Sequence, residues 1–215
     1  MRTMQKVIVW MVIGVAFHFC MIPAAAAPSL TGSTGMIRIP TADALQLGQY
    51  SAGYYYWKDH GDAVAAVGLP SGMEVSAFAP WENGISDAWI VNAKYNLNQE
   101  ALLIPAVSIG MEDIGGQGRR SVYGVISKVL PYGFRIHIGI GTGRFDGMFG
   151  AIEKVLNPTP IRKKASGFPV TSIIIEMDGA KLNYGARLRL AQGLRLDTGW
   201  LGQDEKMYLG LTFTH

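Results

Sequence analysis

The chain has 215 residues, of which 49% are hydrophobic and 16% charged, and it contains a single cysteine. Its 19 lysines and arginines stand against 16 aspartates and glutamates. Two of the basic residues, Arg2 and Lys6, belong to an N-terminal leader, so the rest of the chain carries 17 basic and 16 acidic residues. This near-neutral balance gives no indication of a nucleic-acid partner. Because Cys20 also lies in the leader, the remaining chain is predicted to fold without disulfides.

The leader has the three parts of a secretory signal peptide. A charged start, MRTMQK, precedes an apolar run over residues 7–22, and Pro23 with the alanines at 24–27 offers small-residue cleavage sites. The apolar run is shorter than the roughly 20 residues that a membrane-spanning helix needs. Cys20 follows Phe19 and not the small residue that lipid attachment requires. We therefore predict a signal peptide at residues 1–27, cleaved near Ala27, and a single exported domain at residues 28–215.

The segment KLNYGARLRL, residues 181–190, alternates polar and apolar side chains without a break. A strand points successive side chains to opposite faces, so one face is polar and the other apolar. The same pattern recurs at residues 88–97, 103–112, 133–141, 193–201 and 206–213, and less cleanly at 49–57 and 72–81. Asp178-Gly179 is a strong hairpin signal, and the segments 69–72, 82–84, 115–118 and 131–133 are weaker turn signals.

These strands predict an all-β fold, an antiparallel up-and-down transmembrane β-barrel of about 10–12 strands. Residues 28–48 precede the first strand, and the sequence leaves open whether they form a lead-in or a short plug inside the barrel. A soluble periplasmic barrel or sandwich with its apolar face inward is the alternative, because alternation does not say which face is inside. The glycines and charges of the polar faces favour the membrane barrel, as do the aromatic residues Trp89, Tyr95, Trp200 and Phe213 on the apolar faces.

The polar faces carry charges of both signs, which would point to one interior and form an ion-pair network. Its predicted members are Glu74, Lys94, Glu112, Arg135, His137, Glu176, Arg187, Arg189, Arg195 and Asp197. Barrels of about eight strands are filled by side chains, whereas open aqueous channels need 16 to 18 strands. A barrel of 10–12 strands with this network leaves little room for a polymer, so we do not expect a polysaccharide conduit.

Candidate chemistry outside this network is sparse. His60 lies beside Asp59 and Asp62, which could orient a general base, although a solvated polar turn is the favoured interpretation. No histidine pair has metal-ligand spacing, and GIGTGRFDG at residues 139–147 lacks the strand-then-helix context of a phosphate loop. The proline-rich segment at residues 157–169 contains a basic patch, which is either a solvated connector or an outward-facing polyanion-binding loop. The patch consists of Arg162, Lys163 and Lys164.

The segment TGSTGMIRIPTADALQLGQYSAGYYY, residues 31–56, resembles the opening of the YjbH-like proteins, with Thr34-Gly35, Pro40, Ala42 and Gly48 in the expected order. NAKYNL, PAVSIGMEDIGG, MDGAKLNYGARLRL and LDTGWLG are similar to further stretches of that family. The resemblance implies an outer-membrane β-barrel associated with exopolysaccharide biosynthesis or export. Typical members are several times longer, so this chain resembles a short, single-domain version. It also departs from common outer-membrane strands in that Phe213 is followed by Thr214 and His215.

From these observations we expect an accessory or scaffold protein of exopolysaccharide production in the bacterial outer membrane, without enzymatic activity or a cofactor. The expected partners are outer-membrane lipid, the outer-membrane assembly machinery, and exopolysaccharide or its secretion machinery. A narrow pore for ions or small solutes is the first alternative, gated by the interior arginines and Glu176. The second is a membrane-embedded enzyme that modifies lipid or glycan with His60.

Overall fold

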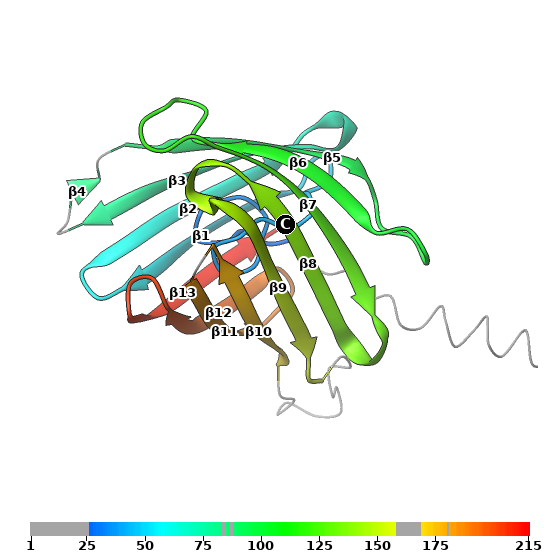
Figure 1. Ribbon diagram of the computed structural model, residues 1–215. Helices are drawn as coiled ribbons and strands as arrows, with labels where there is room; N and C mark the ends of the chain where they lie inside the picture. Colours follow the sequence, from blue (N-terminus) through cyan, green and yellow to red (C-terminus); the bar gives the residue numbers. More distant parts are fainter. Residues whose placement is uncertain (1–25, 83–84, 87, 158–168, 180) are drawn as a thin grey trace, which may run out of the picture.

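The computed structural model describes residues 26–82, 85–86, 88–157, 169–179 and 181–215. These residues form a barrel of antiparallel strands around a coiled N-terminal segment (Figure 1). Within the described ranges there is no α-helix, and no helix is long and apolar enough to cross a membrane. The strands are β1 Tyr50–Trp57, β2 His60–Gly68, β3 Met73–Glu82, β4 Ile85–Ser86, β5 Ile90–Asn98, β6 Ala106–Glu112, β7 Ser121–Leu130, β8 Phe134–Gly141, β9 Gly147–Val155, β10 Val170–Asp178, β11 Lys181–Arg189, β12 Leu194–Leu201 and β13 Lys206–Thr214.

The strands close into a ring, because β1 pairs with β13 as well as with β2. Each strand otherwise pairs with its neighbours in the chain, except that β3 pairs with β5 past the two-residue strand β4. The ring therefore contains twelve strands in up-and-down order. A closed sheet leaves no exposed edge. The predicted all-β, up-and-down barrel is confirmed, with a strand number at the upper end of the predicted range.

Eight of the twelve barrel strands coincide with the alternating segments of the sequence, and β2, β7, β9 and β10 do not. The inward faces of these four strands carry apolar residues, so polar and apolar positions no longer alternate. In β10 the run Ile173-Ile174-Ile175 conceals the period, since Ile174 is buried inside while its two neighbours are exposed outside. The Asp178-Gly179 hairpin is present one residue later than predicted, because Asp178 pairs with Lys181.

The apolar faces point outward around the ring. Trp89, Tyr95, Trp200 and Phe213 are between 40% and 52% exposed, as are most aliphatic residues of the same faces. The charged residues Glu74, Lys94 and Glu176 are 2% exposed or less, on the inner faces. The alternative with the apolar face inward is therefore wrong.

The two ends of the barrel differ in their connections. We call the end where β1 begins and β13 ends the terminal end. It carries the turns η1 Pro70–Gly72 and η2 Pro131–Gly133, the β5–β6 loop, the β11–β12 turn and the long β9–β10 connection. The opposite end carries the β1–β2 turn, the connection from β3 to β5, the β6–β7 loop and the turn η3 Gly143–Phe145, together with the β10–β11 and β12–β13 turns.

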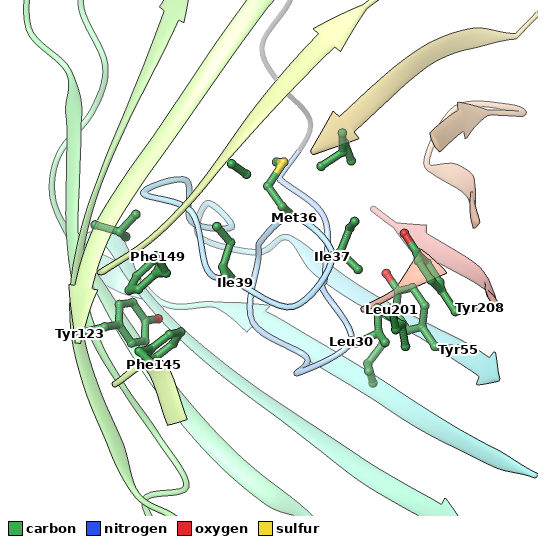
Figure 2. Close-up of a cluster of buried hydrophobic side chains, with 14 of the residues drawn as sticks. Leu30, Met36, Ile37, Ile39, Tyr55, Tyr123, Phe145, Phe149, Leu201 and Tyr208 are labelled. Carbon is green, nitrogen blue, oxygen red and sulfur yellow. The ribbon is translucent and has the colours of Figure 1, made fainter. Parts of the chain in front are cut away.

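Residues 26–45 lie inside the barrel, whereas residues 46–48 are exposed at its terminal end. This settles the alternative left open by the sequence, because the segment is a plug (Figures 1 and 2). It has no regular strand and contains only two isolated bridges, Pro28 with Thr34 and Gly35 with Pro40. A chain of this kind leaves many backbone N–H and C=O groups without partners in its own structure. Buried groups of that kind need partners elsewhere, and the barrel wall must provide them.

Apolar contacts hold the plug from two sides. Its side chains Leu30, Ile37 and Ile39 belong to one buried cluster with aromatic residues of the inner wall (Figure 2). On one side of the plug lie Tyr123, Phe145 and Phe149, and on the other lie Tyr55, Leu201 and Tyr208. The phenylalanine rings of Phe145 and Phe149 stack at 4.4 Å between centroids. The barrel interior is therefore part apolar core and not purely a polar network.

Inward glycines make room for these rings. Gly110 is paired with Tyr123 on the neighbouring strand, and Gly139 is paired with Phe149. A Cβ atom on Gly110 would lie 2.3 Å from the Tyr123 hydroxyl oxygen, and one on Gly139 would lie 2.1 Å from Cζ of Phe149. Such distances are far inside van der Waals contact. Gly110 and Gly139 thus leave the space that the rings of Tyr123 and Phe149 occupy next to the plug.

Candidate functional site: the plugged lumen

Glu74 of β3 ties together two parts of the plug. Its carboxylate accepts the backbone N–H groups of Thr34 and Leu45, each at 2.9 Å, and the hydroxyls of Ser33 and Thr34 at 3.2 and 2.8 Å. Lys94 lies directly across the sheet and forms an ion pair with Glu74 at 3.3 Å. Its ammonium donates to the Thr34 carbonyl at 2.9 Å. A fully buried charge pair needs such extra hydrogen bonds, and here the plug supplies them.

Glu176 of β10 holds the centre of the plug. Three consecutive backbone N–H groups, those of Ile37, Arg38 and Ile39, donate to its carboxylate at 2.7, 2.9 and 3.3 Å. The Asn183 amide of the next strand donates to the same carboxylate at 2.8 Å. Consecutive N–H groups turned toward one point form an anion-binding concavity, and Glu176 supplies the anion. The wall therefore recognises the plug backbone here.

The carbonyls of the plug are bound by donors on other strands. Arg187 donates to the carbonyls of Gly35 and Met36 at 2.8 and 2.6 Å, and Arg195 donates to that of Pro28 at 2.7 Å. Amides and hydroxyls make further contacts: the Asn92 amide to the Thr31 carbonyl, and the Asn96 amide and Ser108 hydroxyl to the Ala42 carbonyl, each at 2.7 Å. Carboxylates of the barrel wall thus accept hydrogen bonds from N–H groups of the plug. Arginine, amide and hydroxyl groups of the wall donate hydrogen bonds to its carbonyls.

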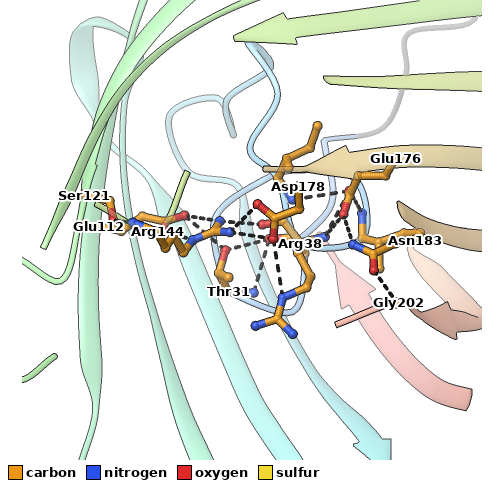
Figure 3. Close-up of polar contacts among 12 residues, drawn as sticks. Thr31, Arg38, Glu112, Ser121, Arg144, Glu176, Asp178, Asn183 and Gly202 are labelled. Carbon is orange, nitrogen blue, oxygen red and sulfur yellow. Dashed lines mark hydrogen bonds and ion pairs between the residues drawn. The ribbon is translucent and has the colours of Figure 1, made fainter. Parts of the chain in front are cut away.

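Near the opposite end, Arg144 of η3 forms the centre of an ionic cluster (Figure 3). Its guanidinium donates to both oxygens of Asp178 at 3.0 Å and to Glu112 at 2.9 Å. It also donates to the carbonyl of Arg38, whose own guanidinium pairs with Asp204 at 2.9 Å. The plug is therefore held by charge at this end as well as by backbone contacts in the middle.

The terminal end has a corresponding pair of clusters. Arg135 donates to Asp43 of the plug at 2.7 Å and to Glu100 of the β5–β6 loop at 3.0 Å. On the other side of the lumen, Asp197 lies between Arg195 at 2.7 Å and Arg187 at 3.3 Å. The charged groups of these two clusters are therefore paired with opposite charges, as expected for groups removed from water.

The structure brings nine of the ten predicted interior residues together around the plug. Arg189 has the same inward register as Arg187 but is exposed at the last position of β11, and it forms no ion pair within the described part of the chain. His137 is 1% exposed, with Nδ1 2.7 Å from the Ser127 hydroxyl oxygen. That hydroxyl accepts the N–H of Ala42, so His137 supports the plug indirectly.

Sequence reasoning left open whether residues 28–48 form the plug, which is the main partner of this network, and it missed Arg144. The segment GIGTGRFDG, residues 139–147, begins in a strand. The strand β8 ends at Gly141, however, and the turn η3 sends Phe145 into the buried cluster and Arg144 to Glu112 and Asp178. The signal that could have found it is Asp146-Gly147, because both residues have positive φ and end the turn.

The remaining candidate residues lie elsewhere. His60 is the first residue of β2, two residues from Asp62 on the same strand, whereas Asp59 is in the turn with φ 67°. The imidazole ring of His60 stacks on Trp57 with an interplanar angle of 11°. The basic patch Arg162, Lys163 and Lys164 lies outside the described residues, as does the turn signal at 83–84. The connection that contains the patch leaves from the terminal end, where Asn157 donates to the Pro169 carbonyl at 2.8 Å.

One loop of the opposite end is organised by its own carboxylate. Asp113 accepts the backbone N–H groups of Gly118 at 2.6 Å and Gln117 at 2.8 Å. These hydrogen bonds favour the charged form and hold the pKa of Asp113 below its ordinary value. Within the described ranges no group of three acidic, histidine or cysteine side chains could hold a metal ion.

The fold and this site define a class of protein: a closed twelve-stranded β-barrel whose lumen is filled by its own N-terminal segment. Residues 29–167, more than half of the chain, match the sequence profile of the YjbH family, described as exopolysaccharide biosynthesis protein YbjH. The chain therefore belongs to the YjbH family, as its resemblance indicated. No curated protein matches the chain. The family match includes the plug and all the strands from β1 to β9.

Proposed function

We propose that this protein is an outer-membrane barrel that acts as a non-conducting accessory or scaffold in exopolysaccharide biosynthesis or export. The family description supports the process, and the outward apolar face supports the location. The single observation that supports a non-conducting lumen is the plug. Glu74, Glu176 and Arg187 bind its backbone directly, so the lumen holds a peptide segment in place of a path for a polymer.

The outer surface fits a bilayer in two respects. Its middle is aliphatic, with Ile138, Ile175 and Leu209 between 46% and 51% exposed. Aromatic residues lie near both ends: Trp200 toward the opposite end and Phe213 toward the terminal end. Membrane barrels have such an apolar band between two aromatic girdles. Water would meet this surface only at a large free-energy cost.

The first experiment is fractionation of the outer membrane followed by gel electrophoresis with and without heating. We expect a membrane-bound protein whose mobility changes on heating, because a closed barrel stays folded in cold detergent. Deleting the gene should lower the exopolysaccharide yield, and the intact chain should restore it. A protein found only in the soluble periplasm would contradict the location. A normal exopolysaccharide yield after deletion would contradict the assigned process.

A narrow pore is the second candidate, and the charged inner wall favours it. Arg135, Arg187 and Arg195 would line such a path beside Glu176. Planar-bilayer recordings separate the two candidates. We expect no single-channel currents from the intact protein. Stable single-channel current steps from the intact protein would contradict the scaffold hypothesis and support the pore.

We further propose that the protein has no catalytic activity of its own. His60 stacks on Trp57 at the edge of a two-residue turn, which is the arrangement of a polar turn residue. Replacing His60 by Ala should leave the lipid and glycan profiles of the envelope unchanged. A lost or accumulated lipid or glycan species in His60→Ala cells would restore the enzyme alternative.

A further inference from the structure

Two connections at the terminal end present large apolar side chains to the outside. In the β5–β6 loop, Leu102, Leu103 and Ile104 are 68%, 86% and 59% exposed. In the neighbouring turn η2, Tyr132 is 88% exposed. These four residues are called the apolar tips here. They continue the outward apolar face beyond the ends of the strands, since Leu130 and Phe134, which flank η2, are also exposed.

Several backbone groups of the β5–β6 tip have partners within the protein. The outward-facing Lys128 donates to the carbonyls of Ala101 and Leu102 at 2.6 and 2.9 Å. Ala101 N–H donates to the Ile104 carbonyl at 2.9 Å, which closes the turn. Glu100 then joins the loop to the wall by accepting the Val129 N–H at 2.7 Å. Such internal partners lower the cost of placing these carbonyls against lipid, where water does not satisfy them.

The η2 tip uses the same arrangement. Lys154 faces outward from β9, donates to the Tyr132 carbonyl, and lies over the Phe134 ring at 4.3 Å from its centroid. Tyr132 itself has φ 63°, a left-handed conformation that is uncommon for a bulky residue. An aromatic residue is unusual at a position that favours glycine or asparagine, and here its ring is exposed and does not pack in the fold.

The turn η1 is a natural comparison, because it flanks the β5–β6 loop on one side as η2 flanks it on the other. It has the sequence Leu-Pro-Ser-Gly where η2 has Leu-Pro-Tyr-Gly, and Ser71 has nearly the same backbone angles as Tyr132. Ser71 is exposed as well. Two turns with one backbone geometry, one on each flank of the β5–β6 loop, thus present a hydroxyl in η1 and an aromatic ring in η2. The apolar surface is therefore a local feature of the β5–β8 side and not a consequence of the turn type.

We propose that the apolar tips are a membrane anchor that inserts into the boundary between headgroups and acyl chains at the terminal end of the barrel. Lys128 and Lys154, at the rim of the tips, lie where the phosphates of the headgroups would meet them, and aromatic and lysine side chains are typical of this interface. The occupant is lipid and not a second protein. The anchor rests on the proposed membrane location and fixes how the barrel meets the bilayer on one side.

Single cysteines with an environment-sensitive bimane label test the anchor in the full barrel, reconstituted in phosphatidylcholine–phosphatidylglycerol vesicles. The only native cysteine, Cys20, lies in the predicted signal peptide, so the wild-type protein serves as the blank. The variants are Leu103→Cys and Tyr132→Cys in the tips, Ser71→Cys as the matched turn, and Ile138→Cys in the middle of the outer face. Nitroxide-labelled lipids then report contact with the bilayer.

We expect the labels at residues 103 and 132 to be blue-shifted and quenched by shallow nitroxides, and the label at residue 71 to be neither. The label at residue 138 should be quenched by deep nitroxides. If residue 138 is quenched while residues 103 and 132 behave like residue 71, the anchor is wrong and the membrane location stands. If residue 138 is not quenched either, the membrane location itself is wrong.

Discussion

The inner and outer surfaces of the barrel wall use the same strands in different ways. The inner surface meets one fixed partner, the plug, through directed hydrogen bonds such as those of Glu176 to three consecutive N–H groups. The outer surface presents aliphatic side chains such as Ile138 and Leu209, which require only an apolar surrounding. Substitutions should therefore be costly inside the barrel and mild outside it when they keep the apolar character.

Removal of the plug is expected to have the largest effect. Deleting residues 29–45 takes away the backbone partners of Glu74, Glu176 and Arg187. Each buried charge left without its partner costs about 3–5 kcal/mol. We expect a sharp loss of the heat-dependent gel shift, and conducting events in planar bilayers from any barrel that still forms.

The intact barrel is the control for the deletion, and addition of the missing segment as a peptide separates loss of the plug from failure to fold. Adding back a synthetic peptide of residues 28–48 to the deleted protein should restore the shift and silence the conductance. A deleted protein with wild-type stability and no conductance would mean that the inner wall does not depend on the plug.

Neutralising one plug contact is next in size. In Glu176→Gln the three plug N–H groups lose a charged acceptor, and hydrogen bonds to charged groups contribute about 1.5–3 kcal/mol each to stability. We expect the free energy of unfolding to fall by about 2–4 kcal/mol, measured by urea titration in lipid vesicles. Ile175→Val, the neighbouring residue on the outer face, should cost less than about 1 kcal/mol. Equal losses in both variants would remove the contrast between the two faces.

Adding a methyl group to an inward glycine tests how tightly the aromatic rings of the inner face are packed. Gly139→Ala places a Cβ against Phe149, whose ring contacts the plug cluster, whereas Gly124→Ala meets nothing within 4 Å. Overpacking of this kind costs about 1–3 kcal/mol. We expect such a loss for Gly139→Ala and none for Gly124→Ala in the same titration. If Gly139→Ala is tolerated, Phe149 can move, and the plug is less tightly packed than its contacts indicate.

The sequence predicted the barrel because most strands alternate without interruption, as in residues 181–190. It also predicted the charged interior, since residues such as Glu112 and Arg135 share the inward register with Gly110 and Gly139. It could not decide between a lead-in and a plug for residues 28–48, because the wall binds the plug by its backbone, and backbone groups are the same in every sequence. Tyr123 and Phe149 were missed for a related reason: inward aromatic residues are opposite glycines that were counted as part of a polar face.

The smallest expected effect comes from two adjacent residues of β10. Ile173 is 46% exposed on the outer face, and Ile174 is 1% exposed in the cluster that contacts the plug. Changing isoleucine to leucine conserves volume but changes shape, which a fluid lipid surrounding accommodates and a packed interior does not. Ile174→Leu should lower the free energy of unfolding by about 1 kcal/mol, and Ile173→Leu should leave it unchanged. If Ile174→Leu also has no effect, the cluster around the plug is plastic, and directed hydrogen bonds alone hold the plug in place.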